Sequence, residues 1–591
     1  MANKNLKKII EKYKVKPAGK AESNVIYLVA SGDLRESANQ TCWAEQEKME
    51  KQLVKIIQSQ KDKYGKKYKV IRAHKYDPKR KHGFISSQKM GHEVFRKIPP
   101  EATVVVAESV WQYSHHVLGP LVVHKGKILT VANWSGTWPG LVGMSNLNAC
   151  LTKHGREYSS LWSVDFTDAF FMKGLRQFLE TGRVKQDTSH AKPFRSAKIN
   201  GYADVVALGR TLAEYLRRNR AIIGPLDEMC MGMENGVFPN DLLYDKGMGK
   251  ENISQSELLA RMETVSDEEG WAVIQWCMDR GMKFDIGPDE AKDLTVKQLT
   301  EHGKMYVAAV RIAEKYGLDC IGIQYQQGLK DCVAASDLVE GLLNNPQRPE
   351  VICDDRDSKQ YGKVIRPGEA IPCFNEVDEG CAVDLVLSSR VWKALGMDPS
   401  ANQEDVRWSR PYTGTIETTG GVMEVESEEV WVELLSGSSP ASHFVGGYAG
   451  ASSERQSAMY FPKGGGTLKG VGKCGEVVWS RNYIDEKGDL CMDLGRGGIC
   501  GLPEAETQDR LKKTTPQWPI KHLIRYGVSR NQFMAKHKSN HETILYADDA
   551  ESANQAMLAK AAMADELGMK VFICGSFDLK DSLEYRAKGK K

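Results

Sequence analysis

The sequence predicts an α/β protein with two doubly wound αβα domains, followed by a β-rich C-terminal domain. Continuous apolar runs alternate with amphipathic helical segments through residue 365, which is the pattern of parallel sheets covered by helices. Beyond that point glycine and serine become dense between short β-type runs. The length agrees with several domains, because 591 residues are too many for one core and domains usually have about 100 to 200 residues. We place the three domains at residues 1–190, 191–365 and 366–591.

In the first domain a helical leader at 5–13 is followed by a set of buried strands. Their continuous apolar runs lie at 24–30, 69–73, 102–107 and 127–132. After the first strand, apolar residues from Cys42 to Ile57 recur at helical spacing, so one helix face packs on the sheet.

Polar and aromatic residues follow several of these strands, where ligands of such sheets bind. Arg35 follows the first strand, Trp111 follows the run at 102–107, and the turn with Gly136, Pro139 and Gly140 follows the last. Each has a structural alternative. Arg35 could form a surface ion pair, Trp111 could belong to the core, and the glycines could serve only the turn.

The second domain is predicted to continue the alternation of helices and strands. Helices are expected at 201–218, 254–261, 267–280 and 305–316, and strands at 221–224 and 319–324. Ser254 with Glu257 fits a capping box. Gln324 and Gln326 are two residues apart, so on an extended chain both point the same way. They could bind sugar hydroxyls or orient a metal ligand, or they could satisfy backbone groups.

The third domain contains short β-type runs between glycine-rich turns. Its expected elements are strands at 430–435, 476–479, 543–546 and 570–574 and a helix at 552–567. None of the glycine-rich loops has the Gly-x-x-x-x-Gly-Lys-Ser/Thr pattern that cradles phosphates, so we exclude a nucleotide site.

Composition excludes other classes of protein. The net charge is only +4 and the basic segments lack interleaved aromatic residues, which argues against a nucleic-acid-binding protein. No apolar run approaches the roughly 20 residues of a membrane span, and the first residues lack the apolar core of a signal peptide. The thirteen cysteines include no Cys-x-x-Cys and suit buried, reduced thiols. We therefore expect a cytoplasmic protein that is not bound to membranes.

Two carboxylates and a histidine form the candidate functional centre. Glu376, Asp405 and His541 come from separate segments, each beside a predicted strand or strand end. Such a set suits a divalent metal site with open positions, although solvated loop carboxylates are the alternative. His537 and His541 would share a face on a helix, as in a zinc pair. Because Asn540 and Thr543 lead into a strand, we assign His541 alone.

The segments around these three residues resemble the L-fucose/D-arabinose isomerase family. The matching segments are Glu376-Val-Asp378, Asp405-Val-Arg407 and Asn540-His541. Three more stand in the family's order before them: Arg35-Glu-Ser37, Ser135-Gly-Thr-Trp-Pro-Gly140 and Gly322-Ile-Gln-Tyr-Gln326. Each match is short, but together they span nearly the whole chain.

The resemblance implies an L-fucose isomerase-like fold and a metal-dependent aldose-ketose isomerase. Such an enzyme converts L-fucose to L-fuculose, and D-arabinose to D-ribulose, through a metal-stabilised ene-diol. Glu376 and Asp405 would bind the metal and transfer protons, and His541 would complete the protein ligands. Mn²⁺ is the expected ion, with Mg²⁺, Co²⁺ and Fe²⁺ as alternatives.

The resemblance also implies how substrate and subunits are arranged. Gln326, Asn540 and Trp518 would hold the open-chain sugar. The protein would be a homohexamer in which Arg35 and Trp111 lie at a subunit boundary and reach a neighbour's site.

Three rival functions stay open at this stage. One is an L-arabinose-type or other aldose isomerase on the same scaffold. Another is a metal-dependent hydrolase or lyase, in which the same ligands would activate water. The third is a sugar-binding protein without catalytic activity.

Overall fold

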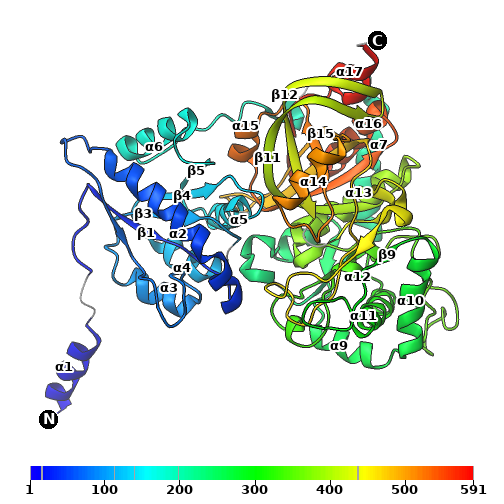
Figure 1. Ribbon diagram of the computed structural model, residues 1–591, viewed down its shortest axis with the longest axis horizontal. Helices are drawn as coiled ribbons and strands as arrows, with labels where there is room; N and C mark the ends of the chain where they lie inside the picture. The colour runs from blue at the N-terminus through cyan, green and yellow to red at the C-terminus, as the bar shows by residue number, and fades with distance from the viewer. Residues whose placement is uncertain are drawn as a thin grey trace.

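The computed structural model describes residues 2–14, 18–111, 113–138, 140–196, 199–435 and 438–589. These residues form a mixed α/β protein whose principal sheets are two parallel ones and a larger, mainly antiparallel one (Figure 1). The predicted leader is helix α1 (Ala2–Tyr13), which lies apart from the rest of the chain (Figure 1). Within the described ranges, none of the helices has the length and apolar character needed to cross a bilayer.

The first domain is doubly wound, as predicted. Its parallel strands have the order β2-β1-β3-β4-β5. They are β1 (Val25–Val29), β2 (Lys69–Arg72), β3 (Thr103–Glu108), β4 (Ile128–Asn133) and β5 (Ser159–Ser163). One face of the sheet packs against α2 (Glu36–Ser59) and α6 (Ala169–Thr181). The other face packs against α3 (Gln88–Phe95), α4 (His115–Val123) and α5 (Gly140–Lys153).

The glycine turn after β4 has a packing role at Gly140. A Cβ atom there would lie 2.1 Å from Asn133 Oδ1 and 2.3 Å from the Glu108 carbonyl oxygen. Only glycine lets the start of α5 approach the ends of β3 and β4 this closely. Gly140 therefore has a structural role, as in the alternative that the glycines serve only the turn. Pro139 lies outside the described residues.

The second part contains a small parallel sheet of order β10-β7-β8. Its strands are β7 (Ala221–Leu226), β8 (Met248–Lys250) and β10 (Cys320–Ile323). The helices of this part are α7 (Ala203–Asn219), α8 (Asp241–Tyr244), α9 (Gln255–Glu263), α10 (Asp267–Asp279), α11 (Val296–Lys315) and α12 (Asp337–Leu343). Alternation of helices and strands is thus confirmed here too.

Two local predictions in this part are wrong. Ser254 caps α9, but no capping box forms, because the Glu257 carboxylate accepts hydrogen bonds from Lys315 and Tyr316 instead. Strand β10 ends at Ile323, so Gln324 and Gln326 do not share a strand face. The Gln324 amide donates to the Glu228 carbonyl oxygen at 3.0 Å, away from the partners of Gln326.

The C-terminal part is β-rich, as predicted, and contains a closed barrel. Strands follow the order β14-β17-β11-β12-β16-β15, and β15 pairs back with β14. They are β11 (Ala401–Thr418), β12 (Gly421–Leu435), β14 (Gly475–Ile484), β15 (Leu490–Ile499), β16 (Lys521–Arg525) and β17 (His541–Ala547). Closure satisfies edges that an open sheet would expose.

Two further strands extend this sheet beyond the barrel. β18 (Lys570–Cys574) runs parallel to β15, and β6 (Ala191–Pro193) pairs with β18. The remaining strands, β9 (Lys283–Phe284) and β13 (Ser452–Ser453), pair with each other. The helices of this part are α13 (Glu379–Ala394), α14 (Glu504–Lys512), α15 (Arg530–Lys536), α16 (Ala550–Glu566) and α17 (Leu583–Gly589).

One large hydrophobic cluster joins all three parts of the chain. It includes Trp111 from the first, Tyr306 from the second, and Phe444 and Trp518 from the third. The three parts therefore share one apolar contact region, and the first part has further hydrophobic clusters of its own. All thirteen cysteines are free thiols and most are buried, as predicted from the sequence.

Candidate active site

The three predicted metal ligands lie together in the structure. Strands β11 and β17 pair antiparallel with Asp405 directly opposite His541, and opposite residues project from the same face of a sheet. Glu376 comes from a short 3₁₀ turn, Asn375–Val377. The Nε2 atom of His541 lies 3.1 Å from Asp405 Oδ1 and 3.5 Å from Glu376 Oε2.

The turn that carries Glu376 has an unusual backbone. Glu376 has φ 53° and ψ 20°, and Val377 follows with φ 54°. Left-handed conformations cost non-glycine residues about 1–2 kcal/mol, and they are especially rare for β-branched valine. Such strain is found most often where a side chain is held for function. The turn is tied to β11 because Gln403 Nε2 donates to the Asn375 carbonyl oxygen at 2.9 Å.

His541 is completely buried between acidic side chains. Burial alone would lower the pKa of His541, but the adjacent carboxylates of Asp378, Asp405 and Glu376 outweigh it and raise the pKa well above the ordinary value. For Asp378 burial acts in the opposite direction and would raise the pKa. The Arg481 guanidinium and His541 outweigh burial and hold the pKa of Asp378 well below its usual range. The raised pKa of His541 and the lowered pKa of Asp378 are the directions expected of a buried ion pair.

The donor atoms fit a divalent cation. Asp405 Oδ1 is buried, and it accepts no well-aligned hydrogen bond from any described residue despite its proximity to His541. The Nδ1 atom of His541 lies 2.9 Å from Asp378 Oδ2, so Nε2 is the ring nitrogen on the side of Asp405 and Glu376. Two carboxylates and one imidazole suit Mn²⁺, Mg²⁺, Co²⁺ or Fe²⁺.

The present spacing is that of ion pairs. Within the described ranges, no group of three or more His, Cys, Asp or Glu side chains is already arranged as a metal site. For Glu376, Asp405 and His541 to bind one cation, His541 must offer an unprotonated Nε2 to the metal.

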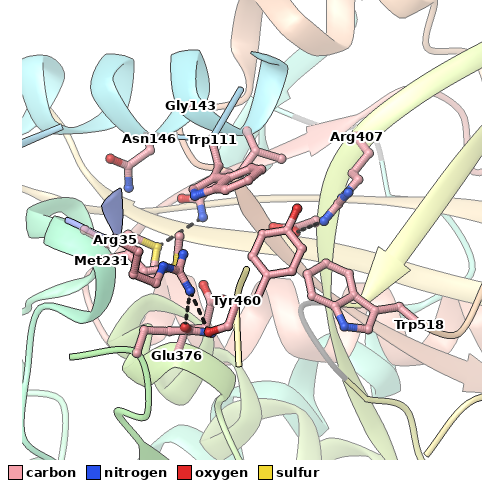
Figure 2. Close-up of a pocket in the computed structure, with 14 residues that line it drawn as sticks. Arg35, Trp111, Gly143, Asn146, Met231, Glu376, Arg407, Tyr460 and Trp518 are labelled. Atoms are coloured by element: carbon pink, nitrogen blue, oxygen red, sulfur yellow. Dashed lines mark hydrogen bonds and ion pairs between the residues drawn. The ribbon is translucent and has the colours of Figure 1, made fainter. Parts of the chain in front are cut away.

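Glu376 and Asp405 line a narrow pocket with a cavity volume of about 40 Å³. All five residues predicted to contact substrate line the same pocket: Arg35, Trp111, Gln326, Trp518 and Asn540. Tyr460 stands between Trp111 and Trp518 (Figure 2), with ring centroids 4.8 Å and 6.0 Å from theirs. The wall thus combines three aromatic rings and two methionines with two arginines, two carboxylates and three amides.

Arg35 and Trp111 are held in place by Asp33. The Arg35 guanidinium donates to Asp33, and Trp111 Nε1 donates to Asp33 Oδ2 at 2.6 Å. Arg35 Nη1 also donates to Gln326 Oε1 at 2.6 Å and to the Tyr460 carbonyl oxygen at 3.0 Å. Both residues line the pocket that contains Glu376 of their own chain. That they reach a neighbour's site in an assembly stays a prediction.

Asn540 and Trp518 take different positions around the centre. Asn540 Nδ2 lies 3.0 Å from His541 Nε2, while its Oδ1 is buried and has no hydrogen-bond partner among the described residues. An amide in this position can exchange bonds with a ligand hydroxyl. The Trp518 ring lies under the Arg407 guanidinium, 4.7 Å from ring centroid to Cζ.

Several pocket residues were not predicted from the sequence. They are Val142, Gly143, Asn146, Met231, Met233, Arg407 and Tyr460. Arg407 could have been predicted from the sequence, because it lies two residues after Asp405 on the same strand. Tyr460 lies in a long segment without periodic pattern, and no sequence signal pointed to it.

His537 does not belong to the centre. It ends α15, and its ring stacks on Phe533 with centroids 4.6 Å apart. Because His541 opens β17 instead of continuing that helix, the two histidines do not form a helical metal pair.

No protein-family model matches this chain, and no curated protein matches it.

Proposed function

We propose that the protein is a metal-dependent aldose-ketose isomerase with an L-fucose isomerase-like fold. The proposed reaction converts L-fucose to L-fuculose, and D-arabinose to D-ribulose. The observation that carries the proposal is the meeting of Glu376, Asp405 and His541, from three distant segments, beside a pocket that Glu376 and Asp405 line. The sequence motifs that resemble the family supply the reaction class.

The pocket wall suits a small polyhydroxylated ligand. Aromatic faces such as those of Tyr460 and Trp518 can pack against the C–H face of a sugar, and Gln326 and Asn540 offer amides for its hydroxyls. Arg35 adds a buried cation bonded to Gln326 Oε1, which fixes the orientation of that amide.

Glu376 and Asp405 are the proposed proton-transfer groups. Isomerisation moves one proton between C1 and C2 and another between the two oxygens, so it needs a base and an acid. Two carboxylates from different elements provide both, and each such group contributes about 10²- to 10⁴-fold. When bound by Glu376, Asp405 and His541, a divalent cation, Mn²⁺ in the first place, would act as a Lewis acid that stabilises the developing negative charge.

The test is an assay of unmodified aldoses with and without Mn²⁺. L-Fucose and D-arabinose should be isomerised, L-arabinose much less, and a chelator should abolish the activity. In D₂O the C2 hydrogen should exchange with solvent, because the route passes through an ene-diol. Retention of that hydrogen would indicate hydride transfer, and turnover only of ester or glycoside substrates would favour the hydrolase or lyase.

Glu376→Gln should keep the fold and lose isomerisation, because the amide can neither accept the proton nor bind the cation as a carboxylate does. Glu426→Gln, an exposed position on β12 away from the pocket, is the matched control and should keep full activity. Full activity of Glu376→Gln would reject the proposed mechanism.

A further inference from the structure

Asp378 is a buried carboxylate whose two oxygens are both held by described groups. Its Oδ1 accepts a hydrogen bond from the Gly380 backbone N–H at 3.0 Å, which caps helix α13. Its Oδ2 accepts from Arg481 Nη1 at 2.8 Å and lies 2.9 Å from His541 Nδ1. The carboxylate is therefore fixed from the helix side and from the barrel side at once.

These contacts determine which ring nitrogen of His541 carries the lone pair that could bind a metal. A carboxylate oxygen can only accept, so a close contact with Asp378 Oδ2 places a hydrogen on Nδ1. In the neutral ring the lone pair then lies on Nε2, the atom next to Asp405 and Glu376. A second contact competes: Gln403 Nε2 lies 3.1 Å from the same Nδ1. If Nδ1 accepted from Gln403 instead, Nε2 would carry the hydrogen.

We infer that Asp378, clamped by Arg481, is the positioning residue that turns the Nε2 lone pair of His541 toward a cation shared with Glu376 and Asp405. This inference rests on the metal centre of the proposed function. A carboxylate that holds the far nitrogen of a metal-binding histidine fixes its tautomer and ring orientation. Arg481 acts one step further out, from strand β14, and is itself buried.

Helix α13 supplies a matched control. Asp384 is also completely buried on this helix and pairs with Lys560 and Ser388. None of its described contacts involves His541 or the pocket. Asp384→Asn should therefore lower stability, as loss of a buried ion pair does, without changing how His541 is held.

The test is Mn²⁺ binding to the metal-free full chain, measured by titration calorimetry alongside thermal melting. Asp378→Ala should weaken Mn²⁺ binding by about 10- to 100-fold. Asp378→Asn keeps an oxygen acceptor, so its loss of Mn²⁺ affinity should be smaller. If the alanine variant does not fold, the asparagine variant provides the test. Asp384→Asn should lower the melting temperature and leave Mn²⁺ affinity unchanged.

The outcomes separate this inference from the proposed function. Unchanged affinity in both Asp378 variants, or an equal loss in Asp384→Asn, would overturn the positioning role. A wild-type chain that binds no Mn²⁺ would overturn both ideas. Mn²⁺ binding that depends on Asp378, in a protein that isomerises no aldose, would reject the isomerase and retain the positioning role.

Discussion

At the scale of single residues, the turn that presents Glu376 is held in a conformation that its sequence disfavours. Glu376 and Val377 both have φ above 50°, and neither is glycine. The fold must supply the energy that keeps them there, through contacts such as the one from Gln403 to the Asn375 carbonyl oxygen. Strain of this type is common at functional sites.

Two substitutions at Glu376 separate strain from lost contacts. Both Glu376→Gly and Glu376→Ala remove the carboxylate and should be inactive, but only glycine adopts the left-handed conformation without cost. Glu376→Gly should therefore be more stable than Glu376→Ala by about 1 kcal/mol in denaturant unfolding. An alanine variant as stable as the glycine variant would show that the turn is not strained.

The sequence allowed part of this site to be predicted at the level of residues. Asp405 and His541 stand in strand-like segments, and their pairing across β11 and β17 follows from how strands project side chains. Asp378 belongs to a segment that resembles the family, but the sequence did not predict its role. Its contact with His541 depends on how α13 docks on the barrel. Tyr460 reaches the pocket through a tertiary path that no local pattern encodes.

At the scale of elements, helix α11 carries a buried histidine that should make stability depend on pH. His302 Nε2 accepts a hydrogen bond from the Gly466 backbone N–H at 3.0 Å, and burial lowers the pKa of His302 to about 4. In the unfolded chain this histidine titrates near 6.5. As pH falls below that value, His302 becomes protonated in the unfolded chain but stays neutral in the folded protein. The free energy of unfolding therefore decreases toward pH 4.

His302→Gln tests this dependence, because glutamine can accept the same hydrogen bond at every pH. The variant should lose less stability between pH 6.5 and 4 than the wild type, by up to about 3 kcal/mol. Denaturant unfolding at several pH values measures it. His92→Gln, on the exposed side of α3, should leave the pH dependence unchanged. Parallel pH curves for wild type and His302→Gln would contradict the assignment.

Element boundaries show where sequence patterns are insufficient. Gly322-Ile-Gln-Tyr-Gln326 alternates like a strand, yet β10 stops at Ile323 and a turn follows. The contact of Gln326 with Arg35, from the first domain, belongs to tertiary packing and not to strand alternation. Strands β1 to β4 were placed well because continuous apolar runs bounded by polar turns leave few alternatives.

At the scale of the whole molecule, the pocket needs all three parts of the chain. Arg35 and Trp111 come from the segments that follow β1 and β3, Gln326 from the second part, and Asp405 from the barrel. The general architecture could be predicted from alternation and glycine content. The way the parts close on each other could not, because it depends on contacts between residues hundreds of positions apart.

Mixing two inactive variants tests whether one chain builds a complete site. Arg35→Ala and Glu376→Gln should each lack activity, and co-expressed chains should recover none, because both residues line the pocket of the same chain. The hexamer implied by the family resemblance, with Arg35 reaching a neighbour's site, makes the opposite prediction. There, some sites of a mixed assembly would contain both native residues, and activity would return.

The central claim is that Glu376, Asp405 and His541 bind one cation beside the pocket that Glu376 and Asp405 line. Anomalous diffraction from crystals soaked in Mn²⁺ tests it most directly. We predict a single strong peak in contact with Glu376, Asp405 and His541 Nε2, which disappears in crystals of His541→Ala. A map without a peak there, or with Mn²⁺ bound only elsewhere on the chain, would contradict the account.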